Sequence, residues 1–177
     1  MQLNLRYLTL GTTDGTLIAL GIVTATRGLA SLHLTLAAAV AGVLSSALSN
    51  AFGAYIAESV IADQELTEYA RHLMVPSLSA TRIGRASRSR TYAYTATMAL
   101  FVLVGAMVPL LPIALLGSGI FARALVVVAS LVTLFCLGAY AGVRIKKNVF
   151  TMGLRTSLVG MIVWGLAWAI GEVLAGA

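Results

Sequence analysis

Apolar residues dominate five long segments of the chain, and polar residues gather in the connections between them. Each segment approaches or exceeds the roughly 20 residues that an α-helix needs to cross a bilayer. Such runs lack the strict alternation of a barrel strand, and a helix satisfies its own backbone hydrogen bonds in lipid. The pattern therefore predicts an all-α integral membrane protein, a single domain over residues 1–177. Its five expected spans are residues 7–26, 31–57, 92–116, 121–143 and 151–175.

The longest connection, residues 58–91, divides into two parts. In residues 58–75, apolar side chains fall on one stripe and acidic residues precede basic ones, a pattern that favours a helix. We expect this helix to continue the second span beyond the membrane until Pro76 ends it. The following stretch, PSLSATRIGRASRSR, predicts a flexible basic loop.

Basic residues are distributed unequally between the two ends of the expected spans. Only Arg27 and Arg123 fall on one side, whereas the other ten arginines and lysines fall on the side of the N-terminus. Cytoplasmic connections carry the excess of positive charge, so we expect the N-terminus inside and the C-terminus outside. The 58–91 connection is then cytoplasmic. Its arginines indicate contact with anionic lipid, not with nucleic acid.

Composition supports this class, because 59% of the residues are apolar and only 10% are charged, with a mean hydropathy of +0.95. Soluble domains carry about 25% charged residues. The single cysteine, Cys136, lies in a span, so one chain forms no disulfide framework. We find no nucleophile elbow, zinc-protease, P-loop or dinucleotide-binding pattern, and predict that the protein is not an enzyme.

An aspartate stands in the middle of the first span. Asp14 lies in GTTDG, and a carboxylate at this depth costs a few kcal/mol. It can ligate a cation or carry a proton, or it can be a structural residue bonded to a neighbouring helix. Gly11 and Gly15 have the spacing that lets another helix, or a second copy of the chain, approach closely.

The second span carries a seam of small and polar side chains in SSALSNAFG. Ser46, Asn50 and Gly53 recur on one helix face, and Ser49 lies beside them. Their oxygens suit a path for a hard cation, whereas hydrogen bonding between helices explains them equally well. Gly53 also suits close packing of helices.

Further acidic residues follow this seam toward the expected cytoplasmic end. Glu58 lies two turns beyond Asn50 and should mark the mouth of a path. Glu65, Glu68 and His72 lie on the helical extension, and the i, i+4 pair of Glu68 with His72 is the better candidate for metal binding. A solvated helix face is the alternative interpretation.

Two features of the later spans have ordinary interpretations. The prolines of VPLLP, Pro109 and Pro112, are expected to end the third helix at the interface. Trp164 and Trp168, near the end of the fifth span, are expected to be interfacial anchors.

Several ordered motifs resemble the vacuolar iron transporter family. These are TTDGTLIALGIV, SSALSNAFGAYIAES and GAMVPLLP in the first three spans, followed by the LFCLGAYAGVRIKKNVFTMGLRTSLVGMIVWGLAWAIGEVL ending. The resemblance implies a homodimer in a prokaryotic cell membrane, with a path between the first and second spans of both copies. It also implies exchange of a divalent metal, Fe²⁺ or Mn²⁺, for protons, so that metal is cargo and there is no resident cofactor.

The resemblance also assigns candidate ligands and marks departures. The family's first-span aspartate matches Asp14, but its second-span methionine falls on Asn50, a harder oxygen donor, and a plant-type glutamate falls on Gly42. The glutamate-rich cytoplasmic domain is largely missing, which indicates a divergent member. We expect Asp14, Asn50 and Glu58 to be metal ligands on a path that includes Ser46 and Ser49. Transport of a non-metal solute or lipid, or a non-transporting dimer, are the alternatives.

Overall fold

The computed structural model describes residues 5–28 and 31–176 and consists of five helices with no strand in this part of the chain. All five helices are long and apolar enough to cross a membrane, which confirms the predicted all-α class and the five spans. They are α1 (Leu5–Ala25), α2 (Leu32–His72), α3 (Arg82–Leu116), α4 (Ile120–Arg144) and α5 (Val149–Ala175).

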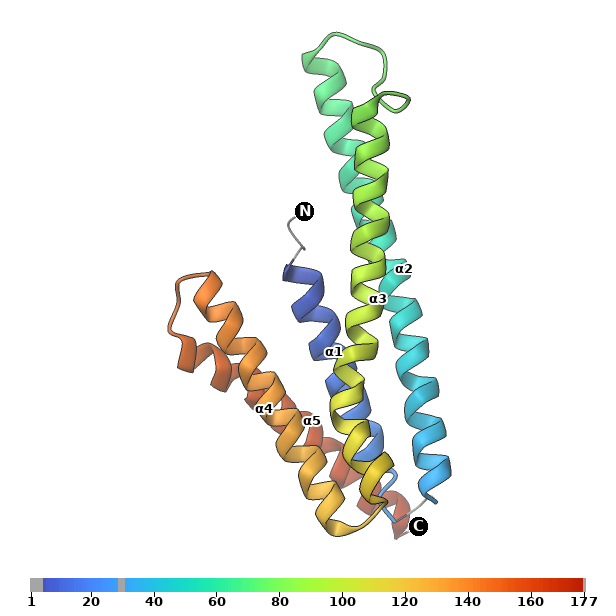
Figure 1. Cartoon of the computed structure of the whole chain (residues 1–177), viewed down its shortest axis with the longest axis vertical. Coiled ribbons are helices and arrows are strands. Elements are labelled where there is room, and N and C mark those ends of the chain that lie inside the picture. The colour runs from blue at the N-terminus through green and yellow to red at the C-terminus, as the bar shows by residue number, and fades with distance from the viewer. Residues whose placement is uncertain (1–4, 29–30, 177) are drawn as a thin grey trace.

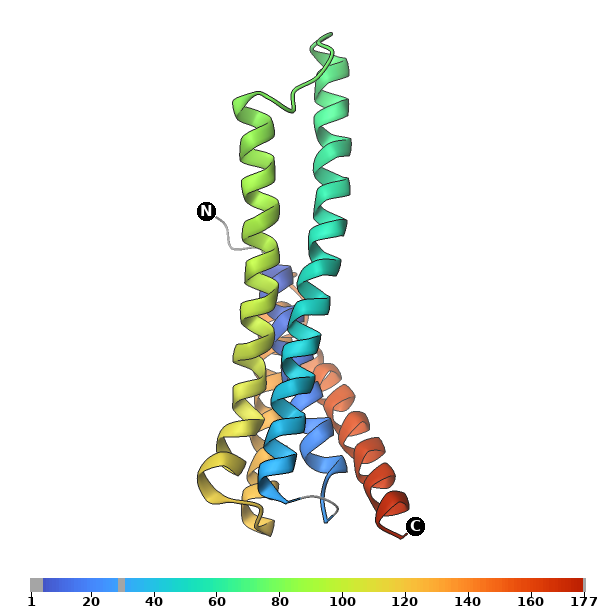
Figure 2. The same ribbon diagram turned by 90° about the vertical axis from the view of Figure 1, so that its right-hand side faces the viewer.

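The helices form two groups that meet at one end of the molecule. Figure 1 shows α1, α2 and α3 side by side, with the α4–α5 hairpin inclined away from them toward the top of the view. The two groups converge at the lower end, where the chain's C-terminus lies. The upper parts of α2 and α3 project beyond the other helices as an antiparallel hairpin (Figures 1 and 2).

The projecting hairpin confirms that the second span continues as one helix, which ends at His72. The prediction of a flexible basic loop is wrong from Arg82 onward, because α3 begins there and its first turns carry the arginines. Thr81 caps this helix by accepting a hydrogen bond from the Gly84 amide. Arginine is a good helix former, and the tip is held by an apolar cluster of Leu66, Ala70 and Leu78.

The prolines do not end the third helix, contrary to the expectation from VPLLP. Pro109 and Pro112 are both buried inside α3, which continues to Leu116. A proline lacks an amide donor and disturbs one turn, and a membrane helix tolerates this where neighbouring helices pack around it. The helix ends one turn later at Gly117, which has a left-handed backbone with φ of 77°.

Glycines bring α1 and α3 into close contact. A Cβ atom at Gly15 would lie 1.9 Å from the Val102 carbonyl oxygen, and one at Gly105 would lie 2.2 Å from that of Thr12. The buried Thr16 hydroxyl donates a hydrogen bond to the Gly105 carbonyl at 2.9 Å. This contact between backbones fixes the rotation of α1, and so the direction in which its polar side chains point.

Candidate functional site

Asp14 accepts two hydrogen bonds from α2. The Ser46 hydroxyl lies 2.6 Å from Oδ2 of Asp14, and Nδ2 of Asn50 lies 2.5 Å from the same oxygen. Asn50 Nδ2 also lies 2.9 Å from the Ser46 hydroxyl oxygen. Three polar side chains from two helices, all half-buried, therefore form one connected cluster in the membrane-spanning part of the bundle.

Asp14 also lines a cavity beside α1. This cavity has a volume of about 310 Å³ and lies between α1 and the α4–α5 hairpin. Thr9, Thr13 and Thr156 also line it, and Gly138 on α4 lets Thr156 of α5 approach closely, since a Cβ atom there would lie 2.3 Å from the Thr156 hydroxyl oxygen. Asp14 thus contacts the polar face of α2 and also an open space, as a group that exchanges a cation or a proton must do.

The chemistry of the cluster suits a cation. Hydrogen bonds from a hydroxyl and an amide stabilise the charged carboxylate, because donors to an ionised acceptor are among the stronger hydrogen bonds. The Asn50 amide donates through nitrogen, and rotation of the amide would offer its oxygen to a bound ion instead. All available ligand atoms are then oxygens, which suit hard divalent ions.

Ser49 and Gly53 do not join this cluster. Both are exposed on α2, and no heavy atom outside that helix lies within 4 Å of a Cβ built at Gly53. The close approaches at Gly11 and Gly15 are made to α3 of the same chain. Part of the small-residue seam therefore faces outward and is open to a second surface.

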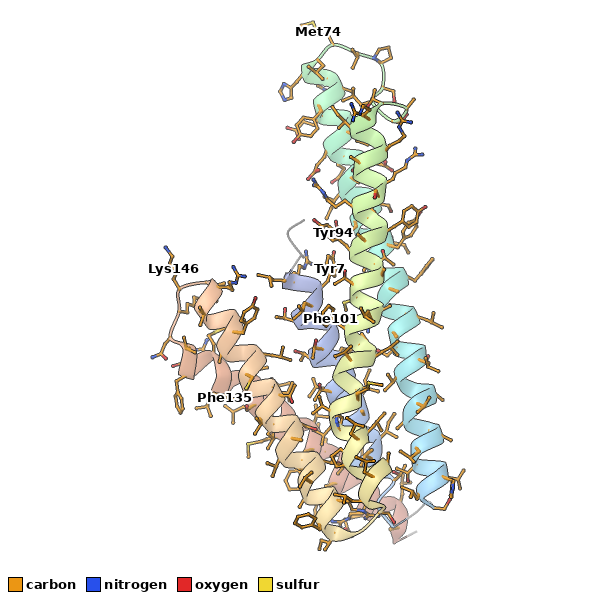
Figure 3. All side chains as sticks on the ribbon, in the orientation of Figure 1. Tyr7, Met74, Tyr94, Phe101, Phe135 and Lys146 are labelled. Atoms are coloured by element: carbon orange, nitrogen blue, oxygen red, sulfur yellow. The ribbon has the colours of Figure 1, made fainter. Side chains whose placement is uncertain are left out.

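Glu58 belongs to a separate polar group further along α2. The Tyr7 hydroxyl donates a hydrogen bond to the Glu58 carboxylate, and the Tyr7 ring stacks on Tyr94 with centroids 5.6 Å apart (Figure 3). Glu58, Glu65 and Arg90 line a cavity of about 210 Å³ between α2 and α3. Glu58 therefore lies further along α2 than the Asp14 cluster and does not contact it; its place at the mouth of a path stays a prediction.

The acidic residues of the extension are exposed. His72 Nε2 lies 3.9 Å from Glu68 Oε1, and each side chain is 74% exposed, so the expected pair forms on a solvated face. Across residues 5–28 and 31–176, no three histidine, cysteine, aspartate or glutamate side chains gather closely enough to hold a metal. Within these residues, Asp14 therefore does not belong to a group of three such side chains.

Sequence reasoning missed the Tyr7–Glu58 hydrogen bond. A tyrosine at the first residue of an apolar span has the pattern of an interfacial anchor, so its position carried no signal of a buried partner. The cavity beside Asp14 was also missed, because it depends on the inclination of α4 and α5, which no local pattern specifies.

Comparisons with known proteins agree with this architecture. A family model described as the VIT family matches residues 70–172, which is more than half of the chain. An uncharacterized protein of the archaeon Methanocaldococcus jannaschii is 28% identical over 169 residues, covering 93% of this chain and 84% of the relative. The family match includes α3, α4 and most of α5 but not Asp14, Ser46 or Asn50.

Proposed function

Because the chain belongs to the VIT family, whose members are membrane transporters rather than enzymes, we propose that it carries a divalent metal cation of the iron or manganese class. Membership in the family makes the protein an integral, multi-pass membrane transporter. The archaeal source of its relative is consistent with the expected prokaryotic membrane.

The observation that carries this proposal is the hydrogen-bonded cluster of Asp14, Ser46 and Asn50, with Asp14 also lining a cavity. An ionisable side chain among membrane-spanning helices is costly, and such residues mark ion and proton pathways. Oxygen donors from a carboxylate, a hydroxyl and an amide match the preference of Mn²⁺ for hard ligands, and imidazole or thiolate ligands are not needed.

A second copy of the chain would complete the ligand set. One Asp14 carries one negative charge, whereas a divalent cation needs about two for neutrality in a medium of low dielectric constant. We propose a homodimer in which α1 and α2 of both copies meet and the two Asp14 side chains face the ion. The outward face of α2 with Ser49 and Gly53 supports this arrangement, because small residues permit close approach of helices.

Proton exchange follows from the same pair of carboxylates. When the cation leaves, two Asp14 side chains would remain close together in a poorly solvated site. Two like charges at short distance favour uptake of protons. One divalent ion would therefore be exchanged for up to two protons, which keeps the site close to neutral throughout the cycle.

The test is Mn²⁺ and Fe²⁺ flux into proteoliposomes under an imposed pH gradient. Asp14→Asn keeps the size and hydrogen-bonding capacity of the side chain but removes its charge, and we expect flux to fall to background. Asp63→Asn, the same change at an exposed position of α2, should leave flux unchanged. Full metal flux in the folded Asp14→Asn protein would refute the proposal.

A second candidate keeps the transporter scaffold and changes the cargo to a non-metal solute or lipid. It is favoured by one observation, that no cluster of three metal-binding side chains lies within the described residues of one chain. A panel of divalent metals distinguishes the two. Absence of flux for every metal, with Asp14 still essential for function in cells, would favour the second candidate.

A further inference from the structure

A third cavity is lined by the end of α1, the start of α4 and the C-terminal half of α5, which meet at the lower end of Figure 1. Its volume is about 450 Å³. The wall is largely apolar, with Val23 from α1 and Val127 from α4, and the polar exceptions include two arginines. The side chains that matter for its chemistry are Arg27, Arg123, Trp164 and Trp168.

The two arginines differ in their ion-pair and hydrogen-bond partners. Arg27 pairs with the Glu172 carboxylate, and its guanidinium lies 5.5 Å from the centre of the Trp168 ring. Arg123 forms no ion pair with a carboxylate of the described residues, and its buried Nε has no hydrogen-bond partner there. A buried donor without an acceptor is unfavourable, so this site has one positive charge in excess and one unsatisfied donor.

We propose that this cavity binds an anionic phospholipid, with its phosphate on Arg123 and Arg27 and an acyl chain along the valine-lined wall. Guanidinium groups match the geometry of phosphate oxygens and bind them with paired hydrogen bonds. Tryptophans prefer the depth at which headgroup and acyl chain meet. An apolar cavity among membrane-spanning helices with a cationic mouth therefore suits a lipid better than a water-soluble anion.

This site is independent of the Asp14 cluster. Val23 follows Asp14 by nine residues, which is about 14 Å along a helix. Variants of the lipid site therefore leave the groups of the proposed transport site in place, and the proposal does not rest on the identity of the cargo.

The experiment is native mass spectrometry of the full-length protein with phosphatidylglycerol or phosphatidylcholine of identical acyl chains. We expect the wild type to retain phosphatidylglycerol in preference to phosphatidylcholine. Arg123→Gln should weaken phosphatidylglycerol binding about tenfold, the size expected from loss of one charge-assisted contact. Arg155→Gln removes an exposed arginine near the opposite end of α5 and should leave binding unchanged.

A second variant tests the apolar part of the site without changing its charge. Ala124 lines the cavity, and Ala124→Phe should fill it and weaken phosphatidylglycerol binding although both arginines remain. Equal retention of the two lipids, or wild-type binding by both variants, would overturn the proposal.

Two further results would identify another occupant. If inorganic phosphate saturates the site and Ala124→Phe does not alter its binding, a free anion is the ligand. A change of oligomeric state in Arg123→Gln without a lipid effect would identify a second copy as the occupant; either result overturns the proposal.

Discussion

A single added methyl group at Gly15 is expected to push α1 away from α3. A Cβ atom there would lie 1.9 Å from the carbonyl oxygen of Val102 and 2.8 Å from the carbonyl carbon. Both are backbone atoms of a helix, so neither can rotate away as a flexible side chain would. Ordinary contact begins at 3.4 Å, and the helices must therefore separate by about 1.5 Å in a closely packed region.

The destabilisation can be bounded from this geometry. Forcing extra atoms into a well-packed interior costs about 1–3 kcal/mol. Gly165→Ala on α5 is the matched control, because no heavy atom outside its helix lies within 4 Å of its Cβ position. Both variants should gain about 0.5–1 kcal/mol from the lower conformational entropy of alanine. The two substitutions are chemically identical, so this gain cancels, and the variants should differ by the packing cost of about 1–3 kcal/mol in the free energy of unfolding.

Thermal unfolding of both variants in the same detergent measures this difference. For a chain of this length, about 2–4 °C corresponds to 1 kcal/mol, so Gly15→Ala should unfold at least about 2 °C below Gly165→Ala. Metal flux provides a second readout, since Asp14 moves with α1 and should lose its contacts with α2. Equal unfolding temperatures and equal flux in the two variants would refute the tight α1–α3 contact.

Two further predictions concern the polar side chains of Tyr7 on α1 and Asn50 on α2. Tyr7→Phe removes the hydroxyl that donates to Glu58 but keeps the ring stacked on Tyr94, so the free energy of unfolding should fall by about 1 kcal/mol, measured by thermal unfolding against Tyr92→Phe. Asn50→Met replaces a hard donor with a soft thioether, and it should raise the ratio of Fe²⁺ to Ca²⁺ flux in competition assays; an unchanged ratio would exclude Asn50 from the ion's ligands.

The five spans were predictable because each is a long apolar run in a medium that permits little except helices. The two ends of α3 were not predictable. Arg82–Arg90 resembles a solvated loop by composition, but the helix is decided by the Thr81 cap and by apolar packing at Leu78, a contact between distant residues. Pro109 and Pro112 resemble helix ends, but surrounding helices hold α3 together through them.

The polar cluster could be anticipated in its parts, because Ser46 and Asn50 share a helix face and Asp14 is a costly residue that needs partners. What local pattern cannot supply is the rotation of α1. That rotation is set by the packing of α1 against α3, and neighbouring residues of GTTDG lie about 100° apart on the helix. Gly15 faces the α3 backbone, where no side chain fits, and Asp14, one residue earlier, is thereby turned toward α2. Gly15 and Asp14 therefore act together, because the close contact of Gly15 with α3 sets the geometry of the hydrogen bonds between Asp14 and α2. A substitution at Gly15 should then lower metal flux although every proposed ligand atom is still present. Asp14→Asn should also lower metal flux, but it should leave the close contact between α1 and α3 unchanged.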